Sequence, residues 1–121
     1  MTAGRHVVLV VDDDDLVRKV VRAVLEADDY EVLEAANGQL ALEMIAERKP
    51  KLVILDVMMP GIDGVDVCRQ MDHGGPRVLM LTARDDLETE ESSRAAGADD
   101  FLGKPFSSLE LLEHVQKLVG T

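Results

Sequence analysis

Short apolar segments alternate with segments of helical periodicity, and this alternation constrains the fold more than any other feature of the chain. Apolar runs predict strands at Val7–Val11, Glu31–Glu34, Leu52–Leu55, Val78–Leu81 and Phe101–Leu102. Helical spacing predicts helices at Leu16–Ala27, from Leu40 to Ile45, near Val65–Met71, around Leu87–Ala96 and at Leu109–Val119. Strand–helix units of this size predict an α/β fold, in which helices cover both faces of a parallel sheet.

The predicted helices differ in the apolar surface that they offer to a core. The first carries a stripe at helical spacing, formed by Leu16, Val17, Val20, Val21, Val24 and Leu25. The fourth is polar from Glu88 to Ser93, and Gly97 is expected to end it. Weak packing suits an element that moves, although it also suits an ordinary solvated helix.

Composition and charge exclude several classes of function. The 121 residues suffice for one domain, and the formal net charge of −11 argues against direct binding of nucleic acid or of an anionic membrane. No apolar run has the length of a membrane span or the pattern of a signal sequence, so we expect a cytoplasmic protein. The single cysteine, Cys68, excludes an internal disulfide and is expected to be a buried or semi-buried thiol.

Polar residues follow four of the predicted strands. Asp12 and Asp13 come after the first strand, Asp56 after the third, Thr82 after the fourth and Lys104 after the fifth. The carboxyl ends of parallel strands share one edge of the sheet, where α/β proteins bind their ligands. We therefore expect these side chains to converge.

The chemistry of this set indicates phosphoryl transfer. Clustered carboxylates repel one another, and Mg²⁺ relieves that conflict because it prefers carboxylate and water oxygens. Lys104 supplies a point charge for a phosphoryl group and Thr82 a hydroxyl donor. Asp56 stands alone on the middle strand and is the expected nucleophile. Each residue taken singly has a structural alternative, and we expect Asp14, Asp15 and Asp63 to be helix-capping residues.

These motifs strongly resemble the receiver domain of two-component response regulators. The resemblance covers nearly the whole chain and includes Val8 to Asp14, Asn37-Gly38, Asp56 to Gly64, Leu81-Thr82-Ala83, Gly97 to Phe101 and Lys104-Pro105-Phe106. It implies that residues 1–121 form one receiver domain with a flavodoxin-like (βα)5 fold, a doubly wound five-stranded parallel sheet of order 2-1-3-4-5. It also implies a phosphoprotein in which Asp56 accepts a phosphoryl group from a histidine kinase or phosphotransfer partner.

The resemblance also implies a role for each residue of the site. Mg²⁺, with Mn²⁺ as a possible substitute, would be held by Asp56, by Asp13 directly, by Asp12 mainly through water and by the Met58 carbonyl. Phosphoryl oxygens would be held by Thr82, the Ala83 amide and Lys104, and Thr82 and Phe101 would form the switch. The Lys104–Pro105 peptide would be cis. The chain would catalyse only its own phosphorylation and a slow loss of the phosphoryl group, which Met58 and Arg84 would protect from water.

Within this family, the segment from Leu81 to Phe106 is most similar to receivers of DNA-binding, winged-helix regulators. Those receivers pair through the fourth helix, fifth strand and fifth helix, and they use basic residues on both helices. Here Glu90 and His114 stand where basic residues are usual, so we expect a monomer or weak dimer. The expected partner of this face is a downstream protein or a C-terminal output domain.

Other functional classes fit the sequence less well. An aspartyl phosphatase of similar fold usually has a second Asp two residues after its nucleophile, but that position is Met58. The chain has neither G-x-G-x-x-G nor G-x-x-x-x-G-K-[ST], which argues against a nucleotide-binding module, and its 2% aromatic content argues against flavin stacking. A Ca²⁺ loop is disfavoured because Leu16 interrupts the acidic spacing.

Overall fold

The computed structural model describes residues 5–71, 74–83 and 86–120, in which strands and helices alternate along the chain. The strands are β1 (Val7–Val11), β2 (Glu31–Ala35), β3 (Leu52–Asp56), β4 (Arg77–Ala83) and β5 (Asp100–Lys104). The helices are α1 (Asp15–Ala27), α2 (Gly38–Arg48), α3 (Gly64–Gln70), α4 (Leu87–Ala96) and α5 (Ser108–Val119). Within these described ranges, no helix is both long enough and apolar enough to cross a lipid bilayer.

All neighbouring strands pair in parallel, and their order is β2-β1-β3-β4-β5. This is the flavodoxin-like arrangement predicted from the sequence. Its register places the polar strand ends at the same height, because Val11 pairs with Leu55 and Asp56 pairs with Leu81. Ala83 pairs with Lys104 on the outer side. Asp12 and Asp56 are therefore neighbours across the carboxyl edge of the sheet.

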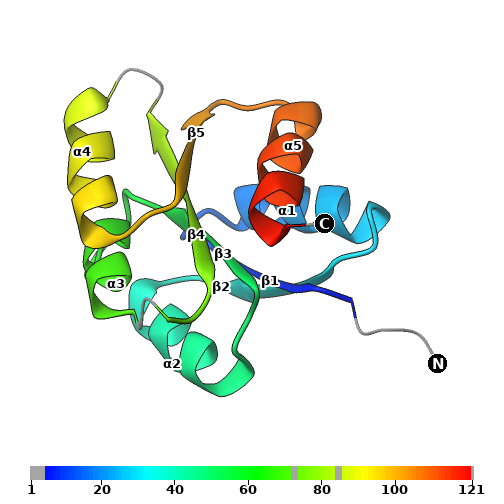
Figure 1. Cartoon of the computed structure of the whole chain (residues 1–121), viewed down its shortest axis with the longest axis horizontal. Helices are drawn as coiled ribbons and strands as arrows, with labels where there is room; N and C mark the ends of the chain where they lie inside the picture. The colour runs from blue at the N-terminus through cyan, green and yellow to red at the C-terminus, as the bar shows by residue number, and fades with distance from the viewer. Residues whose placement is uncertain (1–4, 72–73, 84–85, 121) are drawn as a thin grey trace.

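The strands alternate their side chains between two apolar layers, one on each face of the sheet. On one face, Val8, Val10, Ile54 and other strand residues pack against α1 and α5. On the opposite face, strand residues including Leu9, Val11 and Leu55 pack against α2, α3 and α4. Figure 1 shows the two helical layers on either side of the sheet. Because both faces are covered, β1 is apolar throughout and β3 is apolar up to Asp56. The edge strands β2 and β5 also carry charged residues.

Several details differ from the sequence-based expectations. β5 runs from Asp100 to Lys104 rather than over Phe101–Leu102, so Lys104 lies within the strand and not after it. The α1 stripe is narrower than predicted, because Leu16 and Val20 are 68% and 46% exposed while Val21 and Leu25 are fully buried. Leu16 and Val20 lie one helical turn apart and form a row beside the sheet-facing row. β4 is longer than predicted and includes Thr82 and Ala83, since backbone pairing to β5 continues past the apolar run. Thr82 therefore lies within the strand rather than after it.

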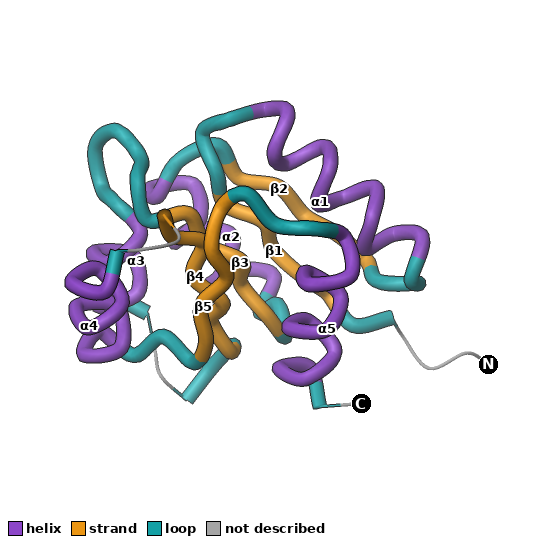
Figure 2. The backbone as a smooth tube through the Cα atoms, turned by 90° about the horizontal axis from the view of Figure 1, so that it is seen from above, coloured by secondary structure: helices purple, strands orange, loops and turns teal. Residues whose placement is uncertain are grey.

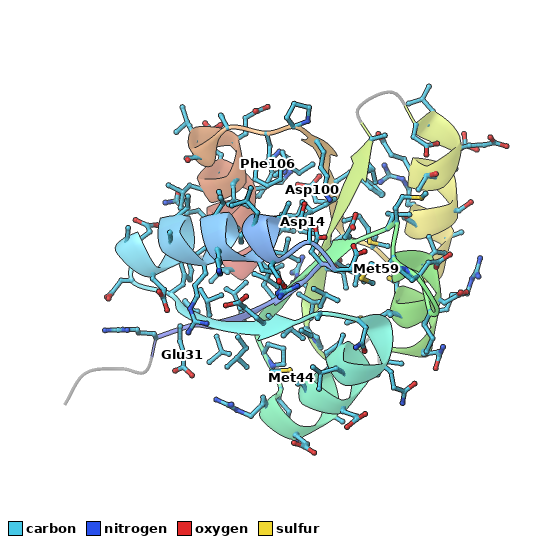
Figure 3. The ribbon with its side chains drawn as sticks, turned by 180° about the vertical axis from the view of Figure 1, so that it is seen from behind. Asp14, Glu31, Met44, Met59, Asp100 and Phe106 are labelled. Atoms are coloured by element: carbon cyan, nitrogen blue, oxygen red, sulfur yellow. The ribbon has the colours of Figure 1, made fainter. Side chains whose placement is uncertain are left out.

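The structure confirms several predicted ends and turns. Asp14 caps α1 by accepting a hydrogen bond from the Leu16 amide, and Asp63 caps α3 through the Asp66 amide. Gly97 ends α4 in a left-handed conformation. Asp14 lies where the chain passes from β1 into α1 (Figure 3). Cys68 is fully buried, and burial raises the pKa of its thiol to about 11.

Candidate functional site

Three carboxylates converge at the carboxyl edge of the sheet. Asp56 is the last residue of β3 and is 5% exposed, whereas Asp12 directly follows β1 and is fully buried. Asp13 lies beside them and is exposed to solvent. Each of the three offers a carboxylate oxygen, and these oxygens all lie within 4.8 Å of one another. Figure 2 shows the loops that leave the sheet at this edge. The convergence predicted from the strand ends is therefore present in the structure.

Lys104, the last residue of β5, completes the cluster. Its ammonium lies 3.0 Å from Asp12 Oδ2 and 3.2 Å from Asp56 Oδ1, so one cation bridges two carboxylates. Burial by itself lowers the pKa of Lys104, but the contacts with Asp12 and Asp56 outweigh burial and raise it. The lysine therefore stays charged at neutral pH and offsets part of the acidic repulsion.

The electrostatic environment singles out Asp56 among the carboxylates. Its burial, followed by repulsion from Asp12, raises the pKa of Asp56 to about 6, although Lys104 and the Met58 amide act in the opposite direction. The Met58 amide donates a hydrogen bond of 3.4 Å to Asp56 Oδ1. A carboxylate that ionises this reluctantly gains much from an additional cation. The donor set of three carboxylates suits Mg²⁺, which prefers hard oxygen ligands.

The loop after β3 holds Asp56 against the start of α3. The Gly64 amide donates to the Val57 carbonyl at 3.0 Å, and a Cβ atom on Gly64 would overlap the carbonyl oxygen of Asp56. Only glycine therefore permits this close approach of helix and strand end. Gly61 has a positive φ of 78° in the same loop. The Met58 side chain is 78% exposed, whereas Met59 is buried beneath the loop (Figure 3).

Thr82 and Ala83 end β4 beside the acidic cluster. Thr82 is 4% exposed, and Ala83 pairs with Lys104 across the ladder. Phe101 on β5 is half-buried, and the Arg94 guanidinium of α4 lies 4.7 Å from the centre of its ring. The Lys104–Pro105 peptide is cis, as the resemblance implies. Arg84 lies outside the described residues.

One residue that contacts the acidic loop, Asp12 to Asp15, was not predicted from the sequence. Arg18 on α1 donates from Nη1 to the Asp12 carbonyl oxygen at 2.5 Å and from Nε to Glu34 at 3.1 Å. Its Nη2 also contacts the Asp15 carboxylate. The spacing of Asp15 and Arg18, three residues apart at the start of a predicted helix, was the available signal.

Fold and site together define a flavodoxin-like α/β protein with an acidic, lysine-containing site at the carboxyl edge of its sheet. Residues 8–116 match the family described as the response regulator receiver domain, and the chain belongs to this family. Members share a general role in two-component signalling, in which phosphorylation operates a switch.

Known proteins resemble the chain in both sequence and structure. It is 46% identical over 114 residues to the response regulator MprA of Mycolicibacterium vanbaalenii, a match that covers 93% of this chain and 49% of that protein. The chain thus spans about half the length of this curated relative. The chemotaxis protein CheY4 of Vibrio cholerae superposes with a TM-score of 0.88 at 32% identity, covering 94% of this chain and 98% of that one. The NtrX receiver domain of Brucella abortus gives 0.87 at 31% identity, with the same coverage.

Proposed function

We propose that residues 1–121 act as one phosphoacceptor switch, in which Asp56 receives a phosphoryl group from a histidine kinase or phosphotransfer protein. The observation that carries this proposal is the convergence of Asp56 with Asp12, Asp13 and Lys104 at one edge of the sheet. Asp56 is central in this set because it lies on the middle strand and contacts both Lys104 and the Met58 amide.

In the proposed reaction, the ionised Asp56 carboxylate attacks the phosphorus of a phosphohistidine. A phosphorus–oxygen bond forms, the phosphorus–nitrogen bond breaks, and the electron pair returns to the imidazole nitrogen of the donor. The pKa of about 6 leaves Asp56 mostly ionised at pH 7. Lys104 is placed to neutralise charge on the transferred group, and Thr82 and the Ala83 amide are the proposed partners of its oxygens.

A divalent cation fits the three carboxylates. Asp12, Asp13 and Asp56 are the proposed protein ligands of Mg²⁺, or of Mn²⁺ in its place, together with the Met58 carbonyl. When bound, the cation supplies charge neutralisation at the phosphoryl oxygens. The chain's own contribution is a set of oxygens held by the strand ends and by the contacts of Asp12 and Asp56 with Lys104.

The phosphorylated form is proposed to be long-lived. Met58 lies two residues after Asp56, and its thioether side chain is exposed at the rim of the site. A thioether cannot orient an attacking water through a strong hydrogen bond, unlike an amide or a carboxylate. We expect Met58→Asn to lose its phosphoryl group faster; an equal or slower decay argues that Met58 does not protect it.

Phosphorylation is proposed to act on the face formed by α4, β5 and α5. Thr82 would move toward the phosphoryl group, and Phe101 would turn into the space released. α4 has little buried apolar surface to resist, because only Ser93 and Ala96 are buried among its described side chains. A modest difference in free energy between two states then suffices to shift their populations.

The same face is proposed to bind a downstream protein or a C-terminal output domain rather than a second copy of this chain. Asp100 already contacts His114 at 2.8 Å and Lys117 at 3.5 Å within its own chain. Glu90 and Glu91 on α4 add negative charge. A partner with basic residues fits this surface better than an identical acidic chain does. Sedimentation of the beryllofluoride-activated protein tests this choice of partner. A stable dimer at low micromolar concentration contradicts the proposal.

The decisive experiment is phosphorylation by acetyl phosphate, followed by intact-mass spectrometry. Wild-type protein should gain one phosphoryl group when Mg²⁺ is present and none in EDTA. Asp56→Asn should gain none, because its neutral amide oxygen is a far weaker nucleophile than a carboxylate oxygen. Labelling of Asp56→Asn at the wild-type level overturns the assignment of Asp56.

A further inference from the structure

Arg18 on α1 contacts three different acceptors, two of which belong to the acidic loop. Its guanidinium donates to the backbone carbonyl of Asp12 at 2.5 Å, to Glu34 of β2 at 3.1 Å and to Asp15 in the first turn of α1. The Arg18 side chain is only 12% exposed, and its contacts with Asp12 and Glu34 are partly buried, whereas the Asp15 carboxylate is exposed. Arg18 therefore joins the acidic loop to α1 and to β2, and none of its described contacts is with the carboxylate group of Asp12, Asp13 or Asp56.

The bond to the Asp12 carbonyl bears on Asp13 through the geometry of the peptide. The carbonyl of Asp12 and the amide nitrogen of Asp13 belong to the same planar group, so fixing the carbonyl fixes the direction in which the chain enters Asp13. On the far side, Asp14 is held as the cap of α1 through the Leu16 amide. Asp13 itself is exposed. The Asp14 amide also donates to Asp12 Oδ1 at 2.9 Å, and the Asp12 amide donates to the Ala35 carbonyl at 3.2 Å. Among the described contacts, the one with Arg18 is made to the Asp12 carbonyl, which belongs to the peptide that leads into Asp13.

We propose that Arg18 is a positioning residue for the divalent cation, acting through the Asp12–Asp13 peptide. This inference rests on the proposed Mg²⁺-dependent function. A loop that carries a metal ligand must be held in its binding orientation before the metal arrives, since ordering it on binding costs affinity. Groups that hold metal ligands in this way, without touching the metal, typically contribute about 10–100-fold to affinity.

The geometry of the guanidinium, rather than its charge, carries this role. Arg18 lies against the carboxylates of Asp15 and Glu34, so its positive charge is largely balanced locally. Removing that charge therefore changes the field at the cation site little. A planar fork with several fixed donors reaches three acceptors at once, whereas a lysine ammonium on a flexible stem does not. Arg18→Lys keeps the charge and removes the fork, and it separates the two effects.

Arg22 offers a matched control one helical turn later. It also contacts Glu34, at 2.7 Å, and it pairs with Glu26 at 3.0 Å. No described contact joins Arg22 to the Asp12–Asp15 loop. Arg22→Gln should therefore lower the melting temperature without altering metal affinity. Glu34→Gln weakens the ion pairs that Glu34 makes with Arg18 and Arg22. It leaves both arginines and the acidic loop unchanged in sequence.

The test is a Mg²⁺ titration of the unphosphorylated protein, monitored by amide NMR shifts, with melting temperatures measured in parallel. We expect Arg18→Lys to raise the Mg²⁺ dissociation constant by about tenfold, the lower end for such contacts. The Mg²⁺ dissociation constant of Arg22→Gln should stay within about twofold of the wild-type value, because Arg22 makes no described contact with the acidic loop. Glu34→Gln should fall between the two.

The outcomes separate this inference from the function on which it rests. If Arg18→Lys and Glu34→Gln bind Mg²⁺ as wild type does, Arg18 is not a positioning residue, while the phosphoacceptor function stands. If Arg22→Gln weakens binding as much as Arg18→Lys, general stability explains the effect and the inference fails. If wild-type protein shows no Mg²⁺-dependent shifts, or Asp13→Ala keeps them, the proposed metal site fails together with this inference. If Arg18→Lys does not fold, the Mg²⁺ dissociation constants of Glu34→Gln and Arg22→Gln are compared instead. Weaker binding by Glu34→Gln alone supports the inference, and equal binding by both variants contradicts it.

Discussion

Helices α1 and α4 both begin at the carboxyl edge of the sheet, but they differ in the apolar packing and ion pairs that hold them. α1 follows the acidic loop, buries Val21 and Leu25 completely, and is tied to β2 through Arg18 and Arg22. α4 begins close after Thr82 and Ala83, and among its described side chains only Ser93 and Ala96 are buried. One side of the site is therefore anchored by apolar packing and ion pairs, and the other has little of either.

This difference matches the two tasks that a phosphorylation switch requires. Carboxylates that bind a cation need a fixed backbone, and the helix after them is the anchored one. A surface that changes shape needs an element whose displacement costs little free energy. Because α4 gives up little buried apolar surface when it moves, the proposed contact of Thr82 with a phosphoryl group can shift it.

The largest expected effect comes from truncating the anchor of α1. Leu25→Ala should lower the free energy of unfolding by about 2–5 kcal/mol, because Leu25 is fully buried and the cavity cannot collapse completely. The matched change on the other helix is Leu87→Ala, at a position that is 70% exposed, and it should cost about 0.5 kcal/mol or less. Urea unfolding of both variants measures the contrast. Equal losses contradict the proposed difference between the helices.

The next effect is expected at the site between the two helices, where burial of Asp56 opposes its ionisation. Its pKa of about 6 exceeds the ordinary value near 3.9, so the folded protein binds more protons than the unfolded chain between about pH 4 and pH 6. The stability that this carboxyl contributes is full below about pH 4 and is lost as the pH rises through about 6.

Asp56→Asn should therefore be more stable than wild type at pH 7 in EDTA, by about 1–3 kcal/mol, and the difference should vanish near pH 4. Urea unfolding across this range measures it. Loss of the contact with Lys104 reduces the gain, because Lys104 then keeps only Asp12. Added Mg²⁺ should reduce this difference in the free energy of unfolding, because it should stabilise wild type more than Asp56→Asn. An Asp56→Asn variant less stable than wild type at pH 7 shows that the lysine contact outweighs the cost of burial.

The fold could be predicted because strand and helix periodicities are properties of local sequence. Strands buried on both faces are apolar throughout, and the register of a parallel sheet brings their ends to one edge. The apolar stripe of α1 was predicted too wide, because Leu16 and Val20 have the right chemistry and spacing for a core row. Which edge of a wide stripe a sheet covers depends on how the helix is rotated, and local sequence does not determine that rotation.

The site was predicted from residue types at strand ends, and Asp12, Asp13, Asp56 and Lys104 do converge. The contacts that hold these residues could not be predicted in the same way. The spacing of Asp15 and Arg18 signals only an ion pair on one helix, whereas the contact with the Asp12 carbonyl depends on the direction in which the guanidinium folds back. The close approach of Gly64 to the Asp56 carbonyl depends on the path of a loop that no periodicity describes.

A smaller effect, of opposite sign, is expected within α4. The Ser93 hydroxyl is fully buried and has no hydrogen-bond partner within the part of the chain that the structure describes, so no hydrogen bond there offsets its desolvation. Ser93→Ala removes the hydroxyl, leaves little cavity, and should raise the free energy of unfolding by about 1 kcal/mol. Hydrogen exchange of the α4 amides should slow accordingly, while the α1 amides change only with global stability. A loss of stability in this variant shows that the hydroxyl is satisfied by a partner in solution.

The smallest expected effect concerns the link between α4 and β5. The Arg94 guanidinium lies 4.7 Å from the centre of the Phe101 ring, and such a contact at an exposed position contributes about 0.5–1 kcal/mol. A double-mutant cycle of Arg94→Ala and Phe101→Leu should therefore give a coupling free energy of this size in urea unfolding. The contact links the Phe101 ring to α4, so it opposes rotation of the ring. Phe101 is the proposed switch residue, and this restraint therefore bears on switching. Arg94→Ala should then shift Phe101 toward its activated orientation without phosphorylation, visible as a change in the NMR shifts of its ring. Additive single effects, together with unchanged ring shifts, exclude Arg94 as the link and leave backbone motion of α4 as the route from Thr82 to the output surface.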